Sequence, residues 1–163
     1  GRPGWEWPTT RDIIVHVTNF NADYEPGDQH EIAGMVHAQG PMLLSRKQVR
    51  FGFKKSDGTN VAVHELAHII DLADGFADGA PSVWAAVPGW DALVRDRIKK
   101  VRRGGKQAPL RAYAGTNEAE LFAVAVEAFF ETPDKLRARD PELFERLSVL
   151  FNLDPATGAL RTP

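Results

Sequence analysis

Short apolar runs separated by turn residues fill the first third of the chain, and this pattern predicts strands. Residues 12–18 contain a β-branched aliphatic run and lead into a turn-rich stretch at 19–28. Two more extended segments are expected, one at 31–37 and one at 42–44, with Gly40-Pro41 as the break between them. The sequence therefore predicts a small twisted sheet in the N-terminal half.

Longer amphipathic segments follow and predict helices. Ser45 can cap one or two helical turns, and Thr59 or Asn60 can cap a longer helix that ends at Gly75. Further helices are expected at 90–103, at 121–131 after a capping sequence at 117–120, and at 141–151. Residues 74–88 form a predicted loop in which Trp84 is a candidate substrate-facing aromatic. A sheet followed by helices predicts an α+β fold.

Composition narrows the class of protein. With 163 residues, 43% of them hydrophobic, the chain suits one domain over 1–163. A net charge of −2 argues against a nucleic-acid partner, and no apolar run reaches the ~18 residues that span a membrane. Cysteine is absent, so only histidine and carboxylates are credible metal ligands. Because the chain begins at Gly1 rather than Met, we expect that an N-terminal segment is missing.

Candidate chemistry lies in the helix predicted after Asn60, where residues 64–68 read His-Glu-Leu-Ala-His. Side chains four apart share a helix face, so His64 and His68 can direct ring nitrogens at one cation. Glu65 lies one step round the helix, where it can take a proton from a zinc-bound water and pass it to a leaving amine. The HExxH pattern therefore predicts a hydrolytic site with one zinc ion.

A catalytic zinc needs a third protein ligand, and two carboxylates are candidates. Asp74 follows His68 closely, but its return to the ion calls for a sharp turn in which glycine is typical at position 71, and that residue is Asp. Glu127 lies in the middle of the apolar helix predicted at 121–131, where an unpaired carboxylate is costly to bury. We favour Glu127 and keep Asp74 as the alternative.

Two further glutamates of the same helical region are candidates to orient a zinc-bound histidine. Glu120 lies two turns before Glu127, and Glu131 lies one turn after it, so either can accept the free ring N–H. Each has a structural alternative. Glu120 can serve the helix cap with Asn117, and Glu131 can be a solvated helix end.

Asp71 and Tyr113 are the remaining candidates. Asp71 faces close to His68 on the predicted helix, so it either orients that ring or holds the following loop. Tyr113 precedes the helix of Glu127, and its hydroxyl can donate to the oxyanion that develops on a scissile carbonyl. Plain packing is the alternative for Tyr113.

Three blocks of residues, found in this order, also match a known pattern. They are Gln39-Gly40-Pro41 with Leu43-Leu44-Ser45, then Asp57–Val61 leading into His64–Asp71, and finally Tyr113-Ala114 with Glu120–Val124 and Glu127–Phe130. In these blocks the chain resembles the Mlc titration factor A family of zinc peptidases. The resemblance covers residues 36–155 and is more specific than HExxH alone.

The resemblance implies a zincin-like domain of the gluzincin type, in which Glu127 matches the family's third ligand. It also implies a bacterial, cytoplasmic metallopeptidase of aminopeptidase type that acts on peptides. The family name records binding to a transcriptional repressor, so such a protein is an implied partner. A membrane is not.

Two other functions are compatible with the predicted zinc site. The chain could be a regulator-binding module that keeps a structural or vestigial zinc, with the basic run 99–103 and the loop of Trp84 as its interface. It could also hydrolyse a non-peptide amide or ester. For the peptidase, we expect an exposed strand edge near 42–45 to receive an extended peptide.

Overall fold

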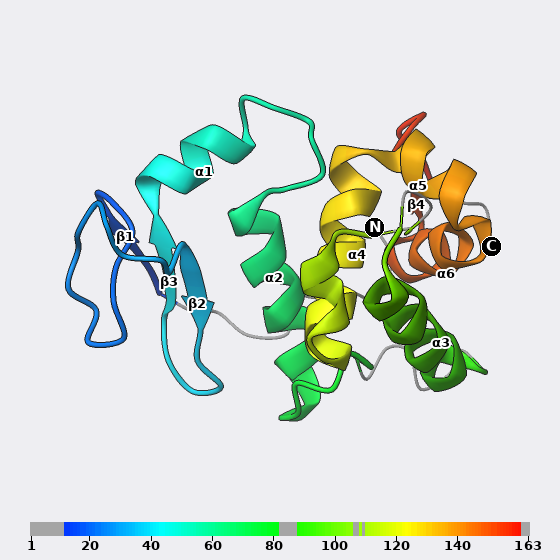
Figure 1. Ribbon diagram of the computed structural model, residues 1–163, viewed down its shortest axis with the longest axis horizontal. Coiled ribbons are helices and arrows are strands. Elements are labelled where there is room, and N and C mark those ends of the chain that lie inside the picture. The colour runs from blue at the N-terminus through cyan, green and yellow to red at the C-terminus, as the bar shows by residue number, and fades with distance from the viewer. Residues whose placement is uncertain (1–11, 82–87, 106–107, 109, 161–163) are drawn as a thin grey trace.

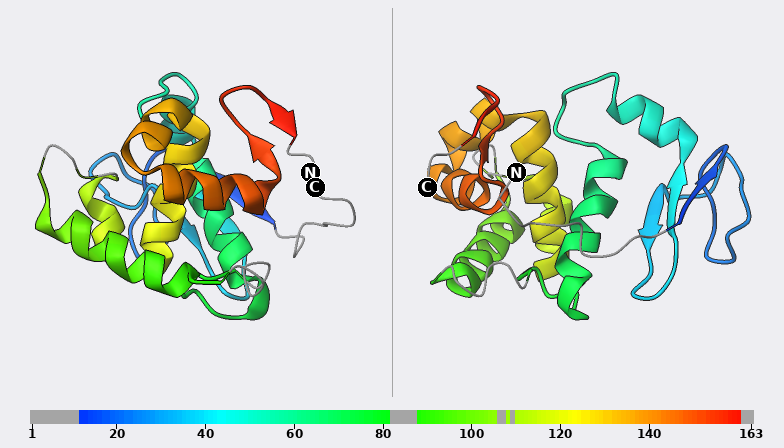
Figure 2. Two further views of the ribbon diagram at one scale, coloured as in Figure 1. Left: turned by 90° about the vertical axis from the view of Figure 1, so that its right-hand side faces the viewer. Right: turned by 180° about the vertical axis from the view of Figure 1, so that it is seen from behind.

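A small sheet and a helical body form the two ends of the molecule, and helix α2 (Val61–Asp71) lies between them (Figures 1 and 2). The computed structural model describes residues 12–81, 88–105, 108 and 110–160. The sheet precedes the helices in the chain, which confirms the predicted α+β, zincin-like class. Within these residues, no helix is both long and apolar enough to cross a membrane.

The sheet contains β1 (Ile13–His16), β2 (Gly34–Val36) and β3 (Met42–Ser45) in the order β1-β3-β2. Strand β3 pairs with β1 in parallel and with β2 in antiparallel orientation, and all four of its residues are buried. The prediction of an exposed edge near 42–45 is therefore wrong. A continuous apolar run is typical of a central strand with both faces covered, and the edges belong to β1 and β2.

Helix starts follow the capping signals in the sequence. Ser45 caps α1 (Arg46–Gly52) by accepting the Gln48 N–H at 3.4 Å. The Asn60 side chain caps α2 by accepting the N–H groups of the second and third helical residues at 3.1 and 3.3 Å. A short 3₁₀ segment, η1 (Leu72–Asp74), continues α2 and ends at Gly75, whose φ of 94° only glycine adopts readily.

The helical body comprises α3 (Trp90–Arg103), the 3₁₀ turn η3 (Ala112–Gly115), α4 (Glu118–Glu131), α5 (Pro133–Arg139) and α6 (Pro141–Phe151). A short hairpin, β4 (Leu153–Asp154) and β5 (Ala159–Leu160), follows. Helix α4 is apolar on nearly every face and runs through the centre of the core, against α2 and α3 (Figure 1). Polar groups on α4 must therefore find partners inside the protein.

Candidate metal centre

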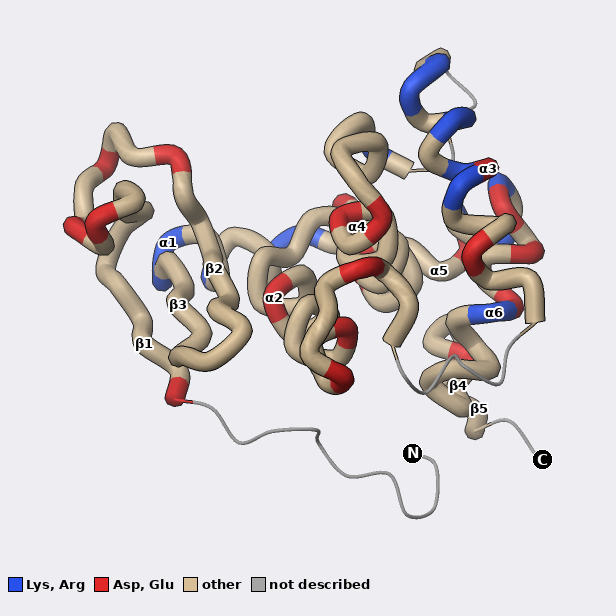
Figure 3. Tube along the Cα trace, turned by 90° about the horizontal axis from the view of Figure 1, so that it is seen from below, with Lys and Arg blue, Asp and Glu red and all other residues tan. Residues whose placement is uncertain are grey.

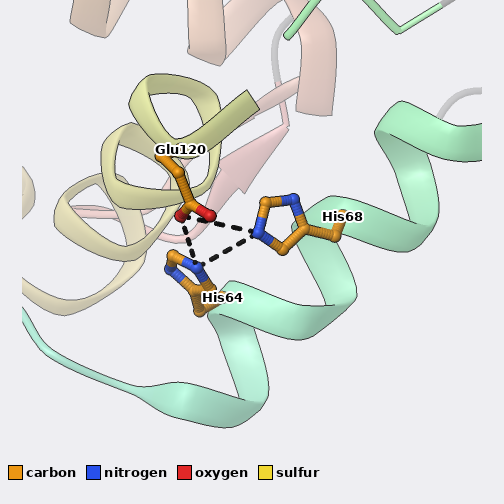
Figure 4. A group of neighbouring side chains, drawn as sticks. All are labelled: His64, His68 and Glu120. Atoms are coloured by element: carbon orange, nitrogen blue, oxygen red, sulfur yellow. Dashed lines mark hydrogen bonds and ion pairs between the residues drawn. The ribbon is translucent and has the colours of Figure 1, made fainter. Parts of the chain in front are cut away.

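His64, His68 and Glu120 form a cluster where α2 lies against α4 (Figure 4). The Nε2 atoms of the two histidines are 3.2 Å apart. Oε2 of Glu120 lies 3.0 Å from Nε2 of His64 and 3.7 Å from Nε2 of His68. Among the described residues, this is the group whose potential ligand atoms all lie within 4.8 Å of one another. Two imidazole nitrogens and one carboxylate oxygen make a donor set that suits zinc.

Glu127 lies on the opposite side of the His64 ring. Its Oε1 is 2.8 Å from Nδ1 of His64 and also accepts a hydrogen bond from the Arg111 guanidinium. Its Oε2 accepts the backbone N–H of Asn60 at 2.7 Å. Glu127 thus lies outside the group of potential ligand atoms, and its role as the third ligand stays a prediction that this placement does not support. Its burial is compensated, as expected, but by hydrogen-bond donors, which include the Arg111 cation, rather than by a metal ion.

Glu120 therefore lies where the sequence suggested Glu127 would be, and Glu127 lies where an orienting carboxylate was expected. They are seven residues apart, so helix periodicity places both on the face of α4 that contacts α2. Periodicity does not show which of the two lies beside the Nε2 atoms of the histidines. Asn117 does cap α4, accepting the Glu120 backbone N–H at 2.8 Å, but the Glu120 side chain points to the histidines. In the sequence, Glu120 could have been identified by its place in the first turn of α4, just before the apolar residues that pack in the hydrophobic core.

The charge balance of the cluster favours a cation. Burial alone lowers the pKa of His64, but the neighbouring carboxylates of Glu120 and Glu127 outweigh burial and raise it to about 9. For Glu120, burial raises the pKa, and the two imidazoles more than reverse that effect and lower it. Such a site can hold a proton between the imidazole and the carboxylate or a metal ion in the same place, because ligands bind metal in their deprotonated forms.

One buried atom fits a metal ion directly. Oε2 of Glu120 is buried, yet no well-directed hydrogen bond reaches it from the described residues. Its approach to the imidazole nitrogens is close without being aligned as a hydrogen bond. A cation bound to these three atoms would satisfy the oxygen, so the residues present fit the metal that the HExxH pattern implies.

Glu65 is buried beside the histidines on α2. Burial raises the pKa of its carboxyl group, and the imidazoles of His64 and His68 oppose that rise. Strand β2 lies directly against this side chain. A Cβ atom added to Gly34 would lie only 2.7 Å from both Cγ and Oε1 of Glu65. Glycine at position 34 is therefore required for the sheet to approach the carboxylate this closely.

Tyr113 lies in η3 at the edge of the cluster, with its ring centroid 5.9 Å from that of His64. Its side chain is 48% exposed. Partial burial raises the pKa of its hydroxyl group, and the negative charge of Glu120 adds to the effect. The phenol therefore stays protonated near neutral pH and can donate a hydrogen bond. The structure brings Tyr113 to the site and leaves its catalytic role a prediction.

The remaining predicted site residues lie outside the cluster. Asp71 is fully buried and accepts the Gly79 N–H at 3.0 Å, so it holds the loop that follows α2. Glu131 accepts the side-chain N–H of Asn60 at 2.9 Å rather than a histidine N–H. Asp74, the alternative third ligand, is exposed and accepts the Phe76 N–H at 3.1 Å. Trp84 lies outside the described residues.

Sequence reasoning missed Arg111 and Asn60 as parts of the site. Arg111 precedes η3 and reaches back to Glu127, and its guanidinium carbon also lies 5.2 Å from the centroid of the Tyr113 ring. Asn60 bonds to both Glu127 and Glu131, which fixes the start of α2 against α4. Only the buried charge of Glu127 indicated in the sequence that such donors had to exist.

Comparison with known proteins identifies a family of metallopeptidases. Residues 1–152 match the family described as glucose-regulated metallo-peptidase M90. Mlc titration factor A of Salmonella arizonae is 32% identical over 174 aligned residues, which cover 94% of this chain and 67% of that protein. Its namesake in Cronobacter sakazakii is 31% identical, over 93% of this chain and 63% of that protein.

The chain thus spans about two thirds of the length of these relatives. The family match extends over the HExxH helix and over the helix that supplies Glu120. On these grounds the chain belongs to the glucose-regulated metallo-peptidase M90 family.

Proposed function

We propose that this protein is a zinc-dependent peptidase whose ion is held by His64, His68 and Glu120. The observation that carries the proposal is the convergence of two Nε2 atoms and one carboxylate oxygen, with the buried Glu65 carboxylate beside them. Three protein ligands would leave a further position of a bound zinc ion to water or substrate, as catalytic zinc sites require. Glu127, through Nδ1 of His64, orients the first of the three ligands.

The chain's own residues can carry the proton transfers of amide hydrolysis. Zinc, when bound, acidifies water and polarises the scissile carbonyl. Glu65 accepts the proton of the attacking water, which its raised pKa favours, and passes that proton to the departing amine. The Tyr113 hydroxyl donates to the carbonyl oxygen as negative charge develops on it. These roles give amine and carboxylic acid as products.

The free edge of β2 supports a peptide as the substrate. Strand β2 pairs with β3 on one side, and its other side has no strand partner among the described residues. Gly34 brings this edge next to Glu65. An extended peptide bound along β2 would lie with a backbone amide near the three ligand atoms. Aminopeptidase-type cleavage and a cytoplasmic location rest on the family resemblance alone.

A second candidate function is regulator binding without catalysis. The relatives are named Mlc titration factor A, and that name describes an effect on a regulator rather than a reaction. Under this proposal the zinc site is structural or vestigial, and a transcriptional repressor is the partner. The buried Glu65 beside three ligand atoms favours the peptidase, because a purely structural site does not need a base and usually has four protein ligands.

Glu65→Gln tests the choice between these functions. We expect peptide hydrolysis to fall by ~10²-fold or more, because the amide cannot accept the proton. Zinc content by elemental analysis and the circular dichroism spectrum should match those of the parent protein. Glu118→Gln is the matched control, because it makes the same change of charge at an exposed glutamate of α4. Hydrolysis that persists in Glu65→Gln, or that resists a chelator, would contradict the peptidase mechanism.

A further inference from the structure

A cavity of about 380 Å³ lies beside the metal centre but does not contain the ligand atoms. Its walls come from residues 57–59 before α2, from the end of α3, and from the sides of α4 and α5. A volume of this size lies at the lower end of the range for small-molecule sites, ~300–1,000 Å³. The function proposed above does not use this cavity.

The floor of the cavity is apolar. Ala108, Ala112 and Ala128 give it partly exposed methyl groups. Its base is formed by four side chains of the helical core that are only 1–6% exposed, which are Val101, Leu110, Val124 and Leu136. These residues come from separate elements and belong to one hydrophobic cluster, so the floor is a rigid surface. A ligand that covers it gains the free energy of removing apolar area from water.

The rim of the cavity is cationic. Arg111, Lys135 and Arg139 line it, against a single carboxylate, that of Asp57. The Asp57 carboxylate accepts the Thr59 N–H at 3.1 Å. The described residues of the lining therefore include three positive side chains and one negative side chain. The positive excess attracts anions.

Two of these cations are not neutralised. In the part of the chain that the structure describes, neither Lys135 nor Arg139 forms an ion pair with a carboxylate. Arg139 donates one Nη1 hydrogen bond, to the carbonyl oxygen of Ala108 at 3.3 Å, and both side chains lie on exposed positions of α5. Arg111 is shared with Glu127 of the metal centre. Lys135 and Arg139 can therefore bind an anion without breaking an existing ion pair.

We propose that this cavity binds a small organic anion, with a carboxylate or phosphate group at the cationic rim and a short apolar body on the aliphatic floor. The rim gives charge-assisted hydrogen bonds to the head group. The floor selects for the body, because bare inorganic anions cannot cover it. This site is distinct from the open position of the metal ion, since none of its lining residues is a ligand.

Calorimetric titration of the zinc-free protein tests the proposal, with hexanoate, acetate and inorganic phosphate as probes at constant ionic strength. We expect hexanoate to bind at least ~10-fold more tightly than acetate, because its added methylene groups reach the apolar floor. The paired substitution Lys135→Ala and Arg139→Ala should weaken hexanoate binding at least ~10-fold. Lys99→Ala removes an exposed lysine of α3 that does not line the cavity, and it should leave binding unchanged.

Three results would overturn the proposal. The first is equal affinity for acetate and hexanoate, and the second is equal weakening by Lys99→Ala and by the paired substitution. The third is binding that appears only after zinc is added, because the anion would then be on the metal ion. A repeat of the hexanoate titration after zinc is added tests the third result. None of the titrations contains a peptide, so their outcome is independent of whether Glu65 catalyses hydrolysis.

Discussion

Glu120 and Glu127 approach the same imidazole from opposite sides, one at Nε2 and the other at Nδ1. This division separates the atom that would bind the ion from the atom that orients the ring. Carboxylates in the orienting position typically change metal affinity by ~10–100-fold when they are removed, whereas loss of a ligand removes part of the coordination sphere. The two glutamates therefore differ in measurable ways.

Glu120→Gln and Glu127→Gln are expected to give different combinations of zinc affinity and stability. Glu120→Gln should lose more zinc affinity than Glu127→Gln does, and it should leave the fold of the zinc-free protein intact. Glu127→Gln should lose ~10–100-fold in zinc affinity. It should also destabilise the zinc-free protein, since an amide cannot accept the donors from His64, Asn60 and Arg111 together. Competition with a chromogenic chelator and urea unfolding measure the two effects. A reversed order of zinc affinities would restore Glu127 as the ligand.

Asp71 gives the zinc-free protein a defined pH dependence. The pKa of Asp71 is raised to about 6. Burial is the largest cause, and the charges of Asp78 and Asp74 add to it, whereas the Gly79 N–H and His68 act in the opposite direction. An unfolded Asp titrates near pH ~4. Between pH ~4 and ~6 the folded protein thus holds a proton that the unfolded chain has released, so the free energy of unfolding falls as pH rises through this window.

Asp71→Asn should reduce that pH dependence. The amide oxygen can still accept the Gly79 N–H, but no charge is buried, so the variant should exceed the parent in stability at pH ~8 by up to about 3 kcal/mol. The two proteins should be nearly equal at pH ~4. Urea unfolding of zinc-free samples at both pH values measures this, with Asp23→Asn, at an exposed position that does not act on Asp71, as the control. Parallel pH profiles for parent and Asp71→Asn would contradict the assignment.

At the scale of elements, local signals predicted the ends of helices better than the packing between them. Helices α3 and α6 begin and end at the predicted residues, and Asn60 caps α2 as expected. The sequence did not indicate α5, because Pro133 suggested a stop although proline also suits a first helical turn. The pairing of β3 between β1 and β2 and the level of α4 against α2 depend on tertiary contacts, which helix and strand periodicity do not contain.

Arg97 joins α3 to the junction between α5 and α6. Its guanidinium, buried on α3, donates to both carboxylate oxygens of Asp140 at 2.5 and 2.8 Å and to Glu142 at 2.8 Å. Asp140 also caps α6 by accepting the Leu143 N–H at 3.1 Å. Arg97→Met should lower the free energy of unfolding by about 3–5 kcal/mol, since it leaves the Asp140 carboxylate buried without a counter-charge.

Chemical denaturation measures this loss. Glu142→Gln removes the partner whose side chain is 56% exposed, and it should change stability by less than about 1 kcal/mol. Equal effects from Arg97→Met and Glu142→Gln would show that burial does not control the contribution of these ion pairs.

At the scale of the whole molecule, the candidate site lies where the two ends of the fold meet. Helix α2 turns Glu65 toward β2 of the sheet and His64 toward α4 of the helical body. Figure 3 shows the same arrangement from below, with the Lys and Arg residues of α3 on the side of the body away from the sheet. A change in the position of the sheet would therefore move the substrate edge relative to the base and the candidate metal ligands, which α2 and α4 carry.

The outer strand β1 carries Ile13, Ile14 and Val15, which are 55%, 45% and 53% exposed. In the described part of the chain its second edge has no strand partner. A bare aliphatic edge is a template for strand pairing between molecules, so we expect concentration-dependent self-association in sedimentation experiments. Val15→Lys should suppress it by charge repulsion, whereas Phe76→Lys, at an exposed aromatic residue far from β1 in the chain, should not. A monomer at every concentration would mean that this edge is protected in solution, and handling the protein at high concentration would then carry no risk of strand-mediated aggregation.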